Sequence, residues 1–162
     1  MVPSIVIGVG NPVITDDAVG IEAVRLLRQQ LAGQTGVTLA ETYTGGLELM
    51  EAMAGYERAF VVDAMVSGHK PGTIHRLRVD QLAGSRNTST THNGTLSAAL
   101  ELGRATGVRL PSEVRIWAVE AGDISTFGEE LTPEVRAAVP IVAGEILKEL
   151  HSSNTTSQEK VL

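Results

Sequence analysis

Hydrophobic residues along the chain fall into two alternating patterns. Continuous apolar or β-branched runs predict five strands, at residues 5–7, 37–42, 58–64, 73–79 and 113–119. Apolar residues at helical spacing predict four helices, at residues 19–31, 47–53, 96–103 and 132–150. Strands that alternate with helices predict an α/β fold with three layers, α/β/α, around a mostly parallel sheet.

The run at 73–79 differs from the other predicted strands. Basic residues interrupt it, and the turn signal Lys70-Pro71-Gly72 precedes it. The connection from the strand at 58–64 is too short to contain a crossover helix. We therefore expect an exposed edge strand that runs antiparallel to the others, whereas the apolar strand at 58–64 is expected to be buried on both faces.

Length and charge limit the class of protein. The 162 residues predict a single domain at 1–151, followed by a polar and disordered tail at 152–162. A net charge of −6 disfavours nucleic acid or an anionic membrane as the partner. The chain has no cysteine, so a thiol nucleophile and thiolate metal ligands are excluded. Neither an export signal nor a membrane span is evident, which favours a cytoplasmic protein.

Three residues that can bind a metal follow predicted strands or precede a helix. Asp17 comes after the first strand, Asp63 ends the third, and His92 lies in a polar segment before the third helix. In open α/β sheets, such residues meet at the carboxyl ends of the strands. Two carboxylates and an imidazole suit zinc or nickel and leave coordination positions for water or substrate.

Each of these residues also has a structural explanation. Asp16 and Asp17 can cap the first helix, Asp63 can stabilise a turn, and His92 can hydrogen-bond within its loop. The convergence of all three predicted ligands on one edge of the sheet favours a functional site. The other histidines, His69, His75 and His151, are assigned no functional role.

The glycines at 8 and 10 suggest a dinucleotide loop, but the surrounding residues argue against it. Val13 occupies the position of the third glycine, and Pro12 lacks a backbone N–H. Carboxylates at the start of the helix would repel a pyrophosphate, so a nucleotide-binding module is disfavoured. Sequence signatures of zinc peptidases, serine hydrolases and P-loop ATPases are also absent.

Four motifs give the chain a family resemblance that extends to about Leu150. They are Gly-Val-Gly-Asn-Pro-Val-Ile-Thr-Asp-Asp-Ala-Val-Gly at 8–20, Val-Val-Asp-Ala at 61–64, Thr-His-Asn-Gly-Thr-Leu at 91–96 and Leu-Thr-Pro-Glu-Val at 131–135. In order and spacing the chain resembles the hydrogenase maturation endopeptidases. These enzymes cut a C-terminal extension from the large-subunit precursor of nickel-iron hydrogenases. The resemblance implies a mixed five-stranded sheet of order 2-1-3-5-4 with strand 4 antiparallel.

The resemblance also implies roles for individual residues. Asp17, Asp63 and His92 match the family's metal ligands, with nickel supplied by the substrate and another divalent ion able to substitute. The acid matching Asp17 is often glutamate in the family, so Asp16 can compete for the ligand role, and it is also a candidate base. The substrate loops contain Asn11, Gly45 and Gly46, and the turn at 42–46 departs from the Asp-Gly-Gly-Thr common in relatives.

The sequence thus predicts an aspartyl-type or metal-dependent endopeptidase that acts on a hydrogenase large-subunit precursor after nickel insertion. The protein is expected to be a monomer, because one domain that recognises a protein substrate requires no second copy. The alternative is a non-catalytic, nickel-binding chaperone or adaptor that docks on the same precursor.

Overall fold

The computed structural model describes residues 2–81 and 95–159, with side chains up to Ser152, and His92 lies outside this range. Five strands form the sheet: β1 (Ser4–Val9), β2 (Val37–Thr42), β3 (Arg58–Met65), β4 (Ile74–Leu77) and β5 (Glu113–Glu120). Four α-helices accompany them: α1 (Val19–Gln30), α2 (Leu47–Met53), α3 (Leu96–Ala105) and α4 (Pro133–Glu159). Two short 3-10 helices are η1 (Thr15–Ala18) and η2 (Val79–Gln81).

The sheet has the predicted mixed topology. The strand order is β2-β1-β3-β5-β4, and every pair is parallel except β4 with β5. The edge strand β4 is only partly buried, whereas β1 and β3 are buried along their whole length. The prediction of an exposed antiparallel edge strand beside a buried parallel centre is therefore confirmed.

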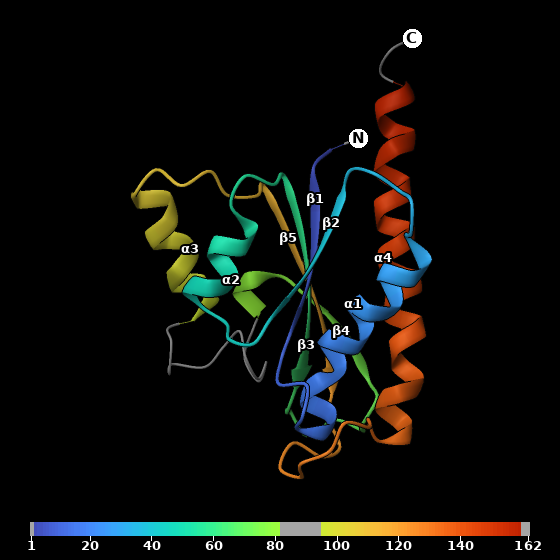
Figure 1. The fold of residues 1–162 in the computed structure, drawn as a ribbon. Helices are drawn as coiled ribbons and strands as arrows, with labels where there is room; N and C mark the ends of the chain where they lie inside the picture. The colour runs from blue at the N-terminus through green and yellow to red at the C-terminus, as the bar shows by residue number, and fades with distance from the viewer. Residues whose placement is uncertain (1, 82–94, 160–162) are drawn as a thin grey trace.

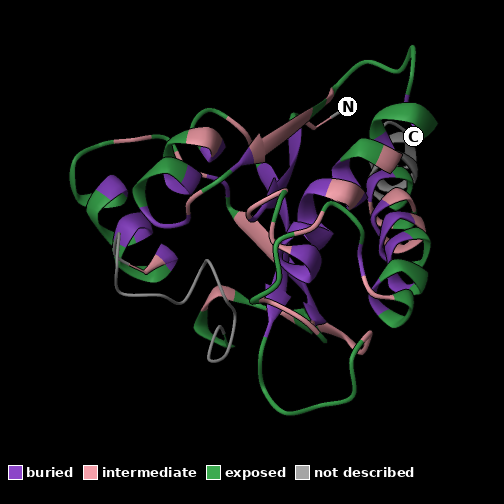
Figure 2. Cartoon of the chain, turned by 60° about the horizontal axis from the view of Figure 1, so that its bottom comes forward, coloured by how far each residue is buried: buried purple, intermediate pink, exposed green. Residues whose placement is uncertain are grey.

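Helices cover both faces of the sheet, as Figure 1 shows. Helices α1 and α4 share one apolar core with the sheet, and α2 and α3 share the other. In the first core the rings of Phe60 and Trp117 meet edge to face at 5.6 Å, an arrangement that adds about 1 kcal/mol to the burial of their surface. Buried residues lie on the sheet-facing sides of the helices and exposed residues on their outer sides (Figure 2).

Two glycines bring α1 unusually close to the sheet. A Cβ atom on Gly8 of β1 would lie 2.1 Å from the carbonyl oxygen of Gly20 in α1. A Cβ atom on Gly20 would lie 2.2 Å from the carbonyl oxygen of Val62 in β3. Because neither position has room for a side chain, the start of α1, and η1 before it, are held directly against β1 and β3.

The structure differs from the sequence-based expectations at three places. The first helix is preceded by the separate 3-10 helix η1, and β4 is shorter than predicted because the chain turns into η2. Helix α4 continues to Glu159, into the segment expected to be a disordered tail. Pro140 lies within the helix, where the sequence places it. Among residues 2–81 and 95–159, no helix is both long and apolar enough to cross a membrane.

Candidate active site

The carboxyl ends of the parallel strands lie at the lower edge of the sheet in Figure 1. Asp17 in η1 follows β1, and Asp63 lies near the end of β3, the strand beside it. Helix η1 contacts β3, and Gly20 anchors the adjoining start of α1 on Val62. The structure therefore brings two of the predicted ligands to the same edge, on neighbouring elements.

Asp17 is buried, at 3% exposure, and its position is set by the loop before it. Its Oδ2 atom accepts a hydrogen bond of 3.0 Å from the backbone N–H of Asn11. A Cβ atom on Gly10, which has φ +152°, would lie 1.9 Å from the carbonyl oxygen of Asp17. Because Gly10 has no side chain, its loop can lie directly against η1, and this close contact positions the carboxylate of Asp17.

The residue Thr15, which opens η1, has the unusual φ of 36°, in the left-handed region. Its hydroxyl donates a hydrogen bond of 2.6 Å to the carbonyl oxygen of Thr126, and its N–H donates to that of Gly128 at 3.0 Å. These contacts to the loop between β5 and α4 hold a conformation that is unfavourable for threonine. Strained backbone of this kind is frequent at functional sites.

Asp63 is fully buried. Its Oδ1 atom accepts a hydrogen bond of 2.8 Å from the N–H of Ala64. Side chains alternate along a strand, and Ala59 and Val61 pack in the core with α2 and α3, so Asp63 points to that face of the sheet. Thr95 caps α3 by accepting the N–H of Ala98, and α3 covers this same face of the sheet.

Asp16 is also fully buried, but it is turned toward the loop between β5 and α4. Its Oδ2 accepts the N–H groups of Gly122 and Asp123 at 2.7 and 2.8 Å, and its Oδ1 accepts the N–H of Thr132 at 2.8 Å. The hydroxyl of Thr132 lies within hydrogen-bonding distance of both oxygens, at 3.0 and 2.8 Å. Four donors match the lone-pair sites of a carboxylate, so Asp16 connects η1 to the start of α4.

The predicted substrate loops also have their conformations fixed locally. The side chain of Asn11 accepts the N–H of Val13 at 3.1 Å and so closes its own turn. Gly46 precedes α2 with φ 62° and ψ −124°, a conformation that requires glycine. Thr44 donates a hydrogen bond to Glu48 in the first turn of that helix.

The structure assembles a second cluster from residues to which the sequence assigned no role. His75 of β4 and His69 of the preceding loop lie against Glu120, the last residue of β5. The ligand atoms of the three residues lie within 4.8 Å of one another. The available signal was Glu120 directly after the predicted strand at 113–119, but the pairing with His75 depends on the antiparallel register of β4.

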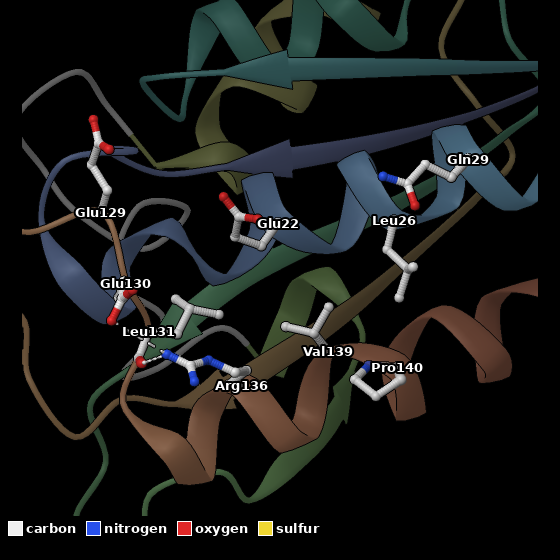
Figure 3. A pocket seen from close by; sticks show the side chains of 9 residues that line it. All are labelled: Glu22, Leu26, Gln29, Glu129, Glu130, Leu131, Arg136, Val139 and Pro140. Atoms are coloured by element: carbon white, nitrogen blue, oxygen red, sulfur yellow. Dashed lines mark hydrogen bonds and ion pairs between the residues drawn. The ribbon is translucent and has the colours of Figure 1, made fainter.

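A groove of about 610 Å³ lies between α1 and α4 (Figure 3). Glu22, Glu129 and Glu130 line it, and Arg136 donates a hydrogen bond of 3.1 Å to the carbonyl oxygen of Leu131 there. Of the predicted ligands and catalytic residues, the three that the structure describes, Asp16, Asp17 and Asp63, do not line this groove. Its size alone therefore does not make it the active site.

Exposed apolar side chains gather at the edge that holds Asp17 and Asp63. Of the large hydrophobic residues that the structure describes as exposed, five lie in segments at the carboxyl ends of the parallel strands: Val13, Tyr43, Leu47, Val66 and Phe127. Phe127 is 82% exposed. Apolar residues around a polar centre are typical of a protein-binding surface.

Comparison with known proteins finds relatives that match most of this chain. A family model described as "HycI: Hydrogenase maturation protease" matches residues 21–149. The Hydrogenase 2 maturation protease of Escherichia coli is 30% identical over 151 residues, which cover 92% of this chain and 91% of the relative. The hydrogenase expression/formation protein HupD of Bradyrhizobium diazoefficiens is 30% identical over 82% of this chain and 69% of its own length.

Solved structures with the same fold also include a hydrogenase maturation enzyme. The hydrogenase maturating endopeptidase HybD from Escherichia coli superimposes with a TM-score of 0.78 at 28% identity, covering 93% of both chains. The match to the family model over most of the chain, the similarity to full-length relatives and the shared fold all agree. This chain belongs to the hydrogenase maturation protease family, and it is an endopeptidase.

Proposed function

We propose that this protease removes the C-terminal extension of a nickel-iron hydrogenase large-subunit precursor after nickel has been inserted. The observation that carries the proposal is the pair of buried carboxylates, Asp17 and Asp63, on neighbouring elements at the carboxyl edge of the sheet. Carboxylate oxygens that neighbouring elements bring together at the carboxyl ends of parallel strands are suitable ligands for a divalent cation. A nickel ion carried by the substrate is such a cation.

In this proposal Asp17, Asp63 and His92 bind the nickel of the precursor. The donor set fits the ion, since carboxylate oxygen and imidazole nitrogen are suitable ligands for nickel and other borderline divalent metals. The N–H groups of Asn11 and Ala64 orient the two carboxylates. The position of His92 stays a prediction from the sequence and from the family resemblance.

Asp16 was the sequence-based candidate for a general base and for a competing ligand. Its four hydrogen-bond donors support a positioning role, because they direct the carboxylate into the loop between β5 and α4. We therefore favour Asp17 over Asp16 as the ligand. Asp16 holds the loop that frames the site.

The surface around the site suits a protein substrate. The exposed apolar residues at this edge provide area for docking the folded precursor, and the loops with Asn11, Gly45 and Gly46 provide backbone for binding its tail. We propose that one copy of the chain is sufficient for this and that processing takes place in the cytoplasm.

The test follows the mass of the large subunit after incubation of the precursor with the purified protein. With nickel-loaded precursor, we expect cleavage by the wild type and by the control His151→Gln, whose side chain is exposed on α4. We expect Asp63→Asn and His92→Ala to slow cleavage about a hundredfold or more, the scale on which loss of one electrostatic group at a reaction centre acts.

Three outcomes would contradict parts of the proposal. Unimpaired cleavage by His92→Ala would exclude His92 from the site. Equal cleavage of nickel-free precursor would exclude recognition of the metal. A stable complex without peptide release would favour the alternative of a non-catalytic chaperone for this pair of proteins.

A further inference from the structure

We propose that His69, His75 and Glu120 form a second binding site for a divalent transition metal, with zinc as the ion that suits it best. The cluster lies at the β4–β5 side of the sheet edge, whereas Asp17 and Asp63 lie at the β1–β3 side. The proposal does not depend on the role of nickel in the substrate.

The two distances from the histidine nitrogens to Glu120 are close to those between ligand atoms of a metal site. His75 Nε2 lies 3.3 Å and His69 Nδ1 lies 3.7 Å from the same oxygen, Oε1 of Glu120. In a tetrahedral zinc site with bonds of about 2.1 Å, neighbouring ligand atoms lie about 3.4 Å apart. Small side-chain rotations therefore suffice to place one ion in contact with all three atoms.

His75 supplies a second observation that points to a missing ligand. Its Nε2 atom is buried from solvent and has no hydrogen-bond partner among the described residues. The contact of 3.3 Å to Glu120 lacks the geometry of a hydrogen bond, so it does not satisfy the nitrogen. A buried polar atom without a partner is costly, and a metal ion at this position would remove the cost.

Glu120 has the burial and support expected of a metal ligand. The residue is 2% exposed, and its only ion-pair contacts within the described chain are to His69 and His75. Ser67 donates its hydroxyl to Oε1 and its N–H to Oε2, the latter at 3.3 Å. Supporting hydrogen bonds of this kind hold ligating carboxylates in position.

To bind a metal ion, His69 would have to exchange its present contact to Ser67 for a bond to the ion. The Nδ1 atom of His69 lies 2.9 Å from the hydroxyl of Ser67. To bind an ion through Nδ1, His69 must carry its proton on Nε2, so the contact to Ser67 is given up for the metal bond. His69 is the most exposed of the three residues, at 61% of its side chain, and has the freedom to make this movement.

The register of the sheet places this cluster beside the proposed active site. Asp63 of β3 and His75 of β4 both pair with Ala118 of β5, so the three residues form one row across the sheet. With strands about 4.8 Å apart, the Cα atoms of Asp63 and His75 are roughly 10 Å apart on the same face. An ion bound by His69 would fix the loop between β3 and β4 next to Asp63.

The test measures zinc binding to the full chain by calorimetry and follows the histidine ring nitrogens by NMR during the same titration. We expect the double variant His69→Gln/His75→Gln to bind one equivalent of zinc fewer than the wild type. The control His151→Gln should bind as many equivalents as the wild type. In the wild type, the ring-nitrogen signals of His69 and His75 should shift on zinc addition and reach saturation together.

Two results would overturn the proposal. One is an unchanged number of zinc equivalents in a folded His69→Gln/His75→Gln variant. The other is the absence of saturable shifts for His69 and His75 in the wild type, a measurement that does not require the variant to fold. A double variant Asp17→Asn/Asp63→Asn should keep this equivalent, which separates the second site from the proposed nickel site.

Discussion

Replacing Asp16 by asparagine tests whether this carboxylate holds the loop between β5 and α4 or acts in the reaction. In the best orientation of the asparagine side chain, its oxygen still accepts hydrogen bonds from the N–H groups of Gly122 and Asp123. Its NH2 group then faces the N–H of Thr132. One buried charge-assisted hydrogen bond is lost and two donors face each other. Hydrogen bonds to charged groups contribute about 1.5–3 kcal/mol each, so we expect a loss of about 3 kcal/mol in the free energy of unfolding.

The assay is urea and thermal unfolding followed by circular dichroism, with cleavage of the precursor measured on the same samples. For a chain of this length, about 3 kcal/mol corresponds to a decrease of roughly 6–12 °C in the melting temperature. The control Glu129→Gln changes an exposed carboxylate in the same loop and should leave stability within about 0.5 kcal/mol. An Asp16→Asn variant of wild-type stability would refute the positioning role, and loss of cleavage at that stability would support the role of a base.

Three further predictions concern packing, docking and the active-site loop. Gly20→Ala should destabilise the fold by about 3 kcal/mol or more in urea unfolding, because its Cβ would overlap the backbone of β3. The control Gly144→Ala, whose Cβ meets nothing within 4 Å, should stabilise α4 by up to about 1 kcal/mol. Equal effects of the two substitutions would disprove the tight contact between α1 and β3. Phe127→Ser should weaken binding of the precursor in pull-down titrations without changing the stability of the fold. Leu102→Ser, on the outer side of α3, should leave binding of the precursor unchanged. Equal binding by the two variants would exclude the apolar edge as the docking surface. Hydrogen bonds from Ser125 and Thr126 hold the pKa of Asp123 below its ordinary value. Because the folded pKa is the lower one, the stabilisation of this loop is complete above the unfolded pKa of about 3.9 and is lost as the pH falls through the folded value. A carboxyl NMR titration that gives Asp123 the pKa of an unstructured peptide, or a higher one, would contradict this.

Residue patterns were sufficient to predict most of the fold because each element has a strong local signal. The parallel strands are short apolar runs between glycines and helices, and the basic residues of β4 identify it as an edge strand. The extra turn η1 was missed because its polar sequence has no helical period, and the contacts that hold it come from a distant loop. The strand order came from the family resemblance, since periodicity says nothing about which strands are neighbours.

For the candidate site, too, the sequence determined some features and the tertiary structure decided others. By itself the sequence determined the acids at the strand ends, because Asp17 and Asp63 follow apolar runs that must be buried and so lie at the edge of the sheet. Only the tertiary structure decided how Asp16 differs from Asp17, since the donors around Asp16 come from residues more than a hundred positions away. It also decided that His75 lies against Glu120, because a pairing across strands depends on register, which adjacent residues in the chain do not encode.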